Sequence, residues 1–447
     1  MKRIRKLFAL VAAAVLLLGI FPATATAPAT ATAHARATLR PVIFVHGGSG
    51  SGSQFQTQAK RFASNGYPVT HVETHEYDSL FVNNTMEQVH AGLDHRIARL
   101  KAATGADKVE LLGHSLGTLV SQQYLKSSAE RAANVAHYVN IDGGSTAGAE
   151  SPPVPTLAIW GEGSTDRKIE GATNLYHSGE SHVQTTSSVA TFKAAYEFFT
   201  GEAPATTGVT PESGEIQIAG RAVYFPFNTG LRDARLDIYP FDPATGRRTS
   251  AQPVATYQFG GSGDGSFGPF KGRGDVHYEF AMSKNGTNQV HHHYYQPFRR
   301  TDLTVRVLSG DPGGPVDWLV ERNRNHVAML VYRNKEWWGD QSDNNDTLAL
   351  NGTNVLNATT APRTKRACGI FLYDWRSDRR TNLNTTVGLF PILPFISGAD
   401  HYMPASTSGT VTLETRQRAA DGQTDRLTIP SWLSDTHMNS IYIDDYA

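Results

Sequence analysis

A serine between two glycines is the residue of this sequence best suited to nucleophilic chemistry. Ser115 is the middle residue of Gly-His-Ser-Leu-Gly at positions 113–117, which has the form G-x-S-x-G. The apolar run 109–112 precedes it, and the stretch 118–125, with helical periodicity, follows it. A strand, a sharp turn and a helix in this order expose such a serine for attack on an acyl carbon. The pattern therefore predicts Ser115 as the nucleophile of an acyl-transfer site.

A glycine-rich segment upstream of the serine could stabilise the negative charge that develops during attack. The apolar run 41–45 is typical of a strand and ends in His-Gly-Gly at 46–48. A strand followed by His-Gly supplies one backbone N–H to the oxyanion hole, and the residue after the nucleophile supplies the other. We therefore predict the N–H groups of Gly48 and Leu116 as the oxyanion hole. A phosphate-binding loop is the alternative, but the pattern G-x-x-x-x-G-K-[ST] is not met, and the first lysine after the segment is Lys60.

A serine nucleophile needs a histidine that takes its proton. Three histidines follow Ser115 before the composition changes near residue 204: His137, His177 and His182. His137 enters an apolar run that favours a packing role, and His177 ends the run that favours the last strand. His182 follows the loop 179–181 and precedes an amphipathic stretch. A loop just past the final strand is where the base belongs, so we predict His182 as the base.

Two aspartates compete for the role of the carboxylate that orients this histidine. Asp142 ends the apolar run 139–141, and Asp166 lies in the loop after the run 156–160. Both positions are at carboxyl ends of expected strands, where an α/β sheet builds its site. The usual arrangement of this architecture favours the later strand, but the residues themselves leave the two candidates nearly even.

Expected strands and helices alternate from residue 39 to residue 200. This alternation predicts a mostly parallel sheet with helices on both faces, which holds the candidate residues. Only about fourteen residues, three of them prolines, separate Asp142 from the next expected strand, which leaves no room for a helical cap. Residues 71–86 are the remaining candidate for a small lid. After residue 204, alternating β-rich runs separated by Gly-rich turns predict an all-β barrel or sandwich region.

The sequence resembles the Archaeoglobus-type long-chain lipases, α/β-hydrolases that carry a C-terminal β-barrel lipid-binding domain. The resemblance extends over residues 40 to 300 and depends on the segments 45–48, 62–68, 112–118, 141–143, 155–161, 181–184 and 201–207. It implies that the acid is the aspartate of the Ile-Asp-Gly segment, here Asp142, in preference to Asp166. The chain departs from the family pattern at Gly48, where a larger apolar residue is usual. The N–H survives this change, while the wall of the acyl pocket becomes more open.

The domain organisation follows from these patterns. Residues 1–37 have a basic start, the apolar run 7–21 and a small-residue tract with several A-x-A sites, which predicts a signal peptide and a secreted product. We predict an α/β-hydrolase domain over 38–203, a β-rich domain over 204–300 and a second β-rich domain over 301–447. The apolar run is short for a membrane span, and no lipid-accepting cysteine follows it, so no transmembrane anchor is expected in the mature protein.

Composition excludes several classes of function. The chain has 41 basic and 41 acidic residues, so no basic field for nucleic acid is expected. The single cysteine, Cys368, excludes an internal disulfide and favours a small buried side chain. Three oxygen-bearing residues, Asp343, Asn345 and Asp346, lack the spacing of a calcium loop and favour a solvated loop. The run 291–293 is His-His-His, but on a strand its members would alternate between faces. We therefore expect no metal and no cofactor.

These observations predict a secreted carboxylic-ester hydrolase, a lipase or esterase, that acts on a lipid or ester substrate at a lipid–water interface. The resemblance favours long-chain acyl esters. A depolymerase of insoluble polyester is the alternative within the enzymes. A surface- or glycan-binding protein with a relic hydrolase domain is the alternative outside them. The complete set of Ser115, His182, Asp142 and the 46–48 segment favours an enzyme, because a relic is expected to lose at least one member. The sequence leaves the acyl-chain preference and the oligomeric state open.

Overall fold

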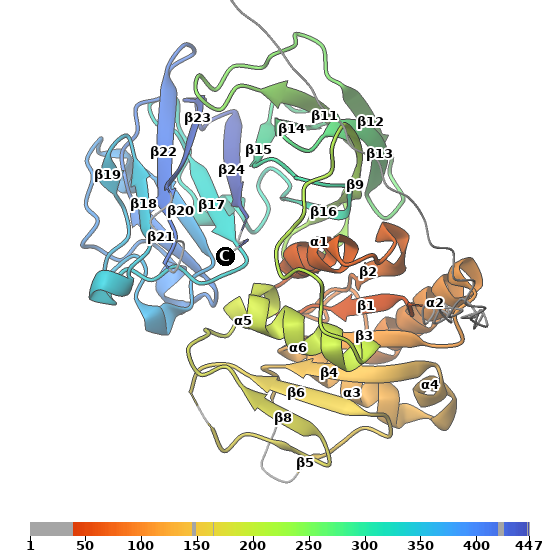
Figure 1. The fold of residues 1–447 in the computed structure, drawn as a ribbon. Coiled ribbons are helices and arrows are strands. Elements are labelled where there is room, and N and C mark those ends of the chain that lie inside the picture. The colour runs from red at the N-terminus through yellow and green to blue at the C-terminus, as the bar shows by residue number, and fades with distance from the viewer. Residues whose placement is uncertain (1–38, 145–148, 164, 419–423, 445, 447) are drawn as a thin grey trace, which may run out of the picture. The chain divides into compact units, whose positions relative to one another are not determined.

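A six-stranded parallel sheet forms the centre of the N-terminal half of the chain (Figure 1). Its order is β2-β1-β3-β4-β6-β8, and every neighbouring pair is parallel. The strands are β1 (Val42–Val45), β2 (Val72–His75), β3 (Val109–His114), β4 (Val135–Ile141), β6 (Thr156–Trp160) and β8 (Thr173–Tyr176). Residues of β1, β3 and β6 are buried throughout, as strands covered on both faces require. The predicted α/β class is therefore confirmed.

Helices cover both faces of this sheet because successive side chains of each strand point to opposite sides. The helices are α1 (Gln56–Ser64), α2 (Met86–Thr104), α3 (Leu116–Ser127), α4 (Ala129–Ala133), α5 (Gln184–Ser187) and α6 (Val189–Thr200). Phe44 of β1 and Leu112 of β3 pack with the apolar residues of α1 and α6. Ile43 and Leu111, one residue earlier in each strand, pack with those of α2 and α3. The central strands thus hold two apolar layers together.

The structure, a computed structural model, describes residues 39–144, 149–163, 165–418, 424–444 and 446. The predicted signal peptide, residues 1–37, lies outside the described residues. None of the helices in the described ranges has the length and apolar character that crossing a bilayer requires.

The predicted lid, residues 71–86, differs in part from the structure. Its residues 72–75 form strand β2, so the lid prediction is wrong for them. A loop that exposes Leu80 and Val82 connects β2 to α2.

The remainder of the chain is mostly β-sheet, as predicted. The strands before residue 310 are β9 (Glu215–Tyr224), β10 (Thr229–Gly230), β11 (Ala234–Phe241), β12 (Ala255–Phe259), β13 (Ser266–Arg273), β14 (His277–Lys284), β15 (Val290–Tyr295) and β16 (Asp302–Ser309). Those after it are β17 (Met329–Arg333), β18 (Thr347–Leu350), β19 (Thr353–Asn354), β20 (Gly369–Tyr373), β21 (Ile396–Asp400), β22 (Thr410–Arg416), β23 (Thr424–Pro430) and β24 (His437–Ile443). Two short strands, β5 (Ala149–Glu150) and β7 (Ile169–Glu170), pair within the α/β half.

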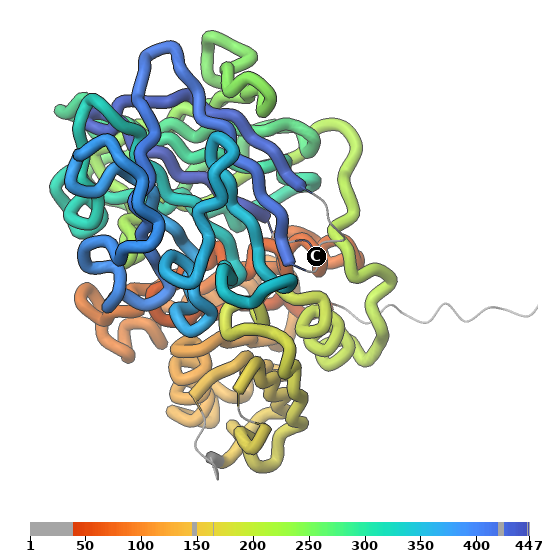
Figure 2. The backbone as a smooth tube through the Cα atoms, turned by 90° about the vertical axis from the view of Figure 1, so that its left-hand side faces the viewer, coloured from red at the N-terminus to blue at the C-terminus, as the bar shows by residue number. Residues whose placement is uncertain are grey.

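One sheet continues across the predicted border between the two β-rich segments. Its order is β12-β11-β14-β15-β24-β17-β20-β21, so strands from 204–300 and from 301–447 share it through the β15–β24 pair. The strand β16 likewise pairs with β9. Figure 2 follows the chain from the α/β half, coloured red to yellow, into these β strands, coloured green to blue. The α/β half contacts them directly, because the Gln56 side chain of α1 donates a hydrogen bond to Asp302 at 2.6 Å.

Candidate active site

Ser115 occupies the turn between β3 and α3, at the carboxyl end of a central strand. Its φ and ψ angles are 51° and −119°, a region that non-glycine residues rarely adopt and that is commonly found at functional positions. The turn is held by hydrogen bonds, because the Ser115 N–H donates to the carbonyl of Ile141 at 3.0 Å and the Thr118 hydroxyl donates to the carbonyl of Ser115 at 2.7 Å. The serine itself is half-buried.

The two glycines of the motif are required by close backbone contacts. A Cβ atom on Gly113 would lie 2.6 Å from the carbonyl oxygen of Gly117, and one on Gly117 would lie 2.2 Å from that of Val45. Both distances are shorter than any real contact of a Cβ atom with oxygen. The helix α3 can therefore begin this close to β1 and β3 only because neither residue has a side chain.

His182 and Asp142, two of the candidate residues, form a hydrogen-bonded pair. The Nδ1 atom of His182 lies 2.6 Å from Oδ2 of Asp142, and both side chains are nearly buried. Asp142 follows β4, and His182 lies in the loop between β8 and α5. Because Nδ1 is used by Asp142, Nε2 is the ring nitrogen that remains for proton exchange.

Asp142 is fixed by two further donors at its other oxygen. The N–H of Gly161 donates to Oδ1 at 3.0 Å, and the guanidinium of Arg167 donates to the same atom at 2.8 Å. Burial raises the pKa of the Asp142 carboxyl, but the hydrogen bond and charge of His182, followed by the charge of Arg167, outweigh it and lower the pKa to about 2. Asp142 is therefore ionised at neutral pH.

The other candidate residues have different surroundings. Asp166 is exposed to solvent, whereas the Arg167 beside it reaches Asp142. His137 pairs with Glu110 at 2.9 Å, and His177 lies 3.4 Å from Glu180. Of the two aspartates that the sequence left open, Asp142 is the one that contacts His182.

The residue before the nucleophile, His114, also holds the histidine loop, a role that the sequence did not reveal. Its Nε2 donates to the carbonyl of His182 at 3.0 Å, and the two rings are 4.7 Å apart. Burial, followed by the nearby charge of His182, lowers the pKa of His114 to about 3. His114 is therefore a neutral donor at physiological pH, and it joins the serine turn to the histidine loop.

The two predicted oxyanion donors lie on adjoining loops. A Cβ atom built on Gly48 would lie 3.7 Å from the Leu116 side chain, in ordinary contact. Leu116 is the first residue of α3, so its N–H has no acceptor within the helix and lies at the positive end of the helix dipole.

The loop that carries Gly48 is held rigidly from several directions. The Gln54 side chain accepts a hydrogen bond from the Gly47 N–H at 3.1 Å, and the Tyr77 hydroxyl donates to the carbonyl of His46 at 2.8 Å. Asn228, from the β region, donates to the carbonyl of Gly50 at 2.6 Å. Donors fixed in advance in this way can stabilise a developing anion without reorganisation.

The C-terminal β region contributes an aromatic ring to the surroundings of His182. The Phe395 ring is stacked on that of His182, with centroids 6.0 Å apart and an interplanar angle of 18°. Phe395 immediately precedes β21, and its carbonyl accepts hydrogen bonds from the N–H groups of Cys368 and Gly369. No local pattern in the sequence marked this residue, because the contact joins positions far apart in the chain.

The described residues offer no metal site. No group of three or more His, Cys, Asp or Glu side chains is placed to hold an ion within the described ranges. The rings of His291 and His293 lie 3.9 Å apart and tilted by 32°, whereas His292 contacts Glu279 at 2.6 Å. The solvated-loop prediction is wrong for Asp346, which is fully buried because Arg333 and Arg418 pair with it.

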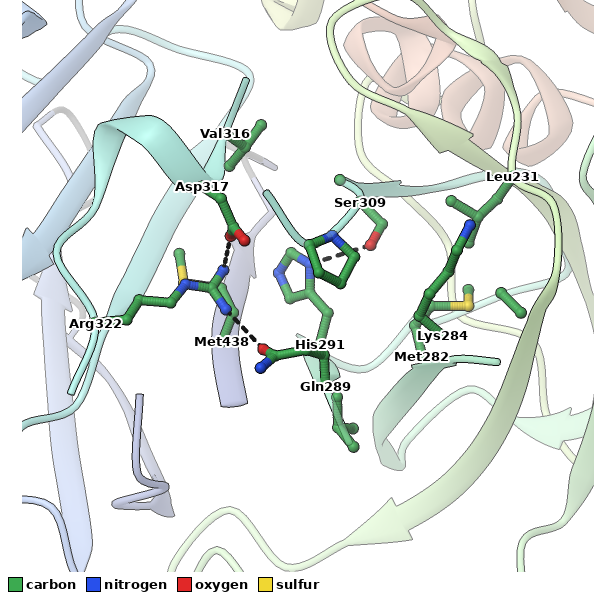
Figure 3. A pocket seen from close by; sticks show the side chains of 14 residues that line it. Leu231, Met282, Lys284, Gln289, His291, Ser309, Val316, Asp317, Arg322 and Met438 are labelled. Atoms are coloured by element: carbon green, nitrogen blue, oxygen red, sulfur yellow. Dashed lines mark hydrogen bonds and ion pairs between the residues drawn. The ribbon is translucent and has the colours of Figure 1, made fainter. Parts of the chain in front are cut away.

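A separate pocket lies within the β region (Figure 3). His291 contacts the Ser309 hydroxyl at 3.2 Å there, and Arg322 pairs with Asp317 and with Gln289. Its volume is about 40 Å³, far below the volume of typical small-molecule sites, about 300–1,000 Å³. This pocket is too small for an acyl chain and holds none of the residues assigned to the chemistry.

Family models match three successive parts of the chain. A model described as lipase (class 2) matches residues 39–139, one described as lipase C-terminal domain matches residues 214–312, and a third C-terminal domain model matches residues 315–447. A search of curated proteins gave no match.

Several solved structures align with part of the chain. Lipase B of Aspergillus fumigatus is 14% identical, with 38% of this chain and 54% of that chain covered and a TM-score of 0.31. A gene product of Listeria innocua is 16% identical over 38% of this chain and 96% of its own, with a TM-score of 0.28. The thioesterase domain of the curacin biosynthetic pathway is 13% identical, with 36% of this chain and 91% of that chain covered and a TM-score of 0.26. The chain thus spans about half the length of the Aspergillus lipase.

Proposed function

Because the matched models fit a lipase family with a C-terminal domain, as the sequence predicted, we propose that this hydrolase is a secreted serine esterase that cleaves long-chain acyl esters. The observation that carries the proposal is the His182–Asp142 pair at 2.6 Å, joined through His114 to the strained turn of Ser115. Three chemical functions (nucleophile, base and orienting acid) come from three strand ends of one sheet.

The proposed reaction proceeds in two halves. Nε2 of His182 takes the proton of the Ser115 hydroxyl as Oγ attacks the ester carbonyl, and the N–H groups of Gly48 and Leu116 donate to the resulting oxyanion. His182 then gives the proton to the leaving alkoxide, and an acyl-enzyme remains on Ser115. A water molecule deprotonated by His182 attacks this ester, and the acid and free serine are released. The carboxylate of Asp142 stabilises the imidazolium in both halves.

Exposed apolar side chains on the helix that follows Ser115 and on the loop after β2 support an acyl chain as part of the substrate. Leu119 is 46% exposed on the first turn of α3, and Leu80 and Val82 are exposed on the loop after β2. Phe395 adds an aromatic surface at His182. Each buried CH₂ group contributes about 0.8 kcal/mol, so such surfaces favour long chains over short ones.

A polyester depolymerase is the second candidate, because it uses the same chemistry on a solid surface. The observation that favours it is Trp318, which is 74% exposed in the β region. Exposed aromatic rings of this kind can adsorb to a polymer film, whereas the acyl-chain proposal depends on the surfaces next to Ser115.

Hydrolysis rates on a series of p-nitrophenyl esters from short to long chains, beside an emulsified triglyceride and a polyester film, test the proposal. We expect kcat/KM to rise with chain length and triglyceride to be cleaved. The Ser115→Ala variant should lose several orders of magnitude in kcat on every ester. Near-full activity of this variant would refute the proposed function. A strong preference for the film over the triglyceride would support the second candidate instead.

The secretion proposal has its own test. Expression of the full chain in a host with a general export pathway should place the protein in the medium. N-terminal sequencing should then locate the first residue of the mature protein after a position between Ala25 and Ala37. Retention of an intact N-terminus inside the cell would contradict it.

A further inference from the structure

A buried carboxylate from the C-terminal β region lies directly against the loop that carries His182. Glu336 follows β17 and is fully buried. Its Oε1 accepts a hydrogen bond from the Val183 N–H at 2.6 Å, and its Oε2 accepts one from the Gln184 N–H at 3.1 Å. The Ser181 hydroxyl also donates to Oε2. One side chain therefore accepts from the residue before His182 and from the two residues after it.

The same loop is held from the opposite side by the α/β half. The carbonyl of His182 accepts hydrogen bonds from His114 at 3.0 Å and from the Thr185 hydroxyl at 2.6 Å. The His182 ring is bound to Asp142 through Nδ1. Glu336 thus supplies the acceptors for the N–H groups of the loop, while the α/β half supplies the donors for its carbonyl and the partner for its ring.

A cluster of buried charges fixes Glu336 and the loop together. Arg418 donates to the backbone carbonyl of Glu336 and to the Gln184 side chain, the latter at 2.9 Å. Arg418 also pairs with Asp346 at 2.8 Å, and Arg333 pairs with Asp346 at 2.6 Å. Arg418 therefore joins the backbone of Glu336, the Gln184 side chain and Asp346 in one network of buried polar contacts.

We propose that Glu336 is a positioning residue of the active site, which holds residues 181–184 so that His182 can exchange a proton with Ser115. The α/β half therefore depends on the C-terminal region for the position of its catalytic base. This inference rests on the proposed function of Ser115 and His182.

The Glu336→Gln variant tests the inference because it keeps the size of the side chain while replacing one acceptor oxygen with an NH₂ group. That group would face a hydroxyl or N–H donor of the loop, so the loop must shift. A shift of about 1 Å at a catalytic group can lower the rate about 100-fold. We expect kcat on a short soluble ester to fall by about this factor while KM changes little, since the substrate surfaces remain.

A matched control is available at another buried contact between the two parts of the chain. Asp302 is buried and accepts a hydrogen bond from Gln56 of α1, on a helix that does not carry His182. Asp302→Asn removes the same charge and should lower the melting temperature without the fall in kcat. Two further variants should give intermediate losses of kcat. Glu336→Asp keeps the negative charge on a shorter side chain, and Ser181→Ala removes one of the three donors to Glu336.

The outcomes separate this inference from the proposed function. If Ser115→Ala is inactive while Glu336→Gln and Ser181→Ala keep the wild-type kcat, the positioning role is refuted and the serine mechanism stands. If Ser115→Ala remains active, the proposed function itself fails. Equal losses of kcat in Glu336→Gln and Asp302→Asn would also overturn the inference, because they would indicate general destabilisation. If Glu336→Gln does not fold, the kcat values of Glu336→Asp and Ser181→Ala are compared with that of Asp302→Asn. Lower kcat in the first two variants supports the inference, and equal kcat in all three overturns it.

Discussion

The substitution Asp142→Asn is the perturbation whose effect the structure specifies in most detail. The carboxylate receives three donors: His182 on Oδ2, and Gly161 and Arg167 on Oδ1. An asparagine has only one acceptor oxygen. If that oxygen stays with Gly161 and Arg167, the NH₂ group faces His182, whose Nδ1 must then act as an acceptor.

This change sets the wrong tautomer of His182. With Nδ1 unprotonated, the ring proton moves to Nε2, which can no longer take the proton of Ser115. The opposite orientation of the amide would direct its NH₂ group at two fixed donors, which costs more. Loss of the correct tautomer lowers kcat by about 10⁴-fold, or about 5.5 kcal/mol of transition-state stabilisation.

Steady-state kinetics on a short soluble ester measures this effect. We expect kcat of Asp142→Asn to fall by about 10³–10⁴-fold with KM nearly unchanged, and Asp166→Asn, an exposed residue, to match the wild type. Asp142 is not the orienting acid if Asp142→Asn keeps more than about a tenth of the wild-type kcat, or if Asp166→Asn shows the larger loss.

Four further predictions concern stability and specificity. Gly117→Ala should prevent folding to the native state, seen as loss of the cooperative thermal transition, because its Cβ would lie 2.2 Å from the Val45 carbonyl. Phe395→Ala should lower the ratio of long-chain to short-chain kcat/KM, and an unchanged ratio would exclude the ring from the acyl site. Asp346→Asn should lower the melting temperature, because it removes the charge that Arg333 and Arg418 share. The pKa of Asp142 is lowered to about 2 in the folded state from its usual 3.8, so its stabilisation is present above pH 4 and is lost as the pH falls through 2; acid unfolding of Asp142→Asn should lack that part of the pH dependence.

The parallel sheet could be predicted because its strands are short apolar runs that both faces of the sheet bury. The run at 156–160 is an example, since every residue of β6 is buried. Ser115 and His182 could be singled out as candidates for a related reason: each has a recognisable local context at a strand end. The local sequence could not decide between Asp142 and Asp166 as the orienting acid, because both follow strands. Only the contact with His182 distinguishes the two aspartates.

Residues whose roles depend on distant partners could not be found in this way. Glu336 and Phe395 reach His182 from the C-terminal β region, and nothing in their own neighbourhoods marks them. Asp346 was expected in a solvated loop because its neighbours are polar, but two arginines, one of them more than seventy positions away, enclose it. Long-range pairing of charges leaves no local periodicity that could be read from the sequence.

Mapping of a covalent adduct tests directly whether Ser115 is the nucleophile. The enzyme is treated with an alkyl phosphonate ester that traps activated serines, and the modified peptide is identified by mass spectrometry. We expect one modified residue, Ser115, with labelling that is abolished in Ser115→Ala and strongly slowed in Asp142→Asn. Labelling of a different residue, or loss of activity without any adduct on Ser115, would contradict this role of Ser115.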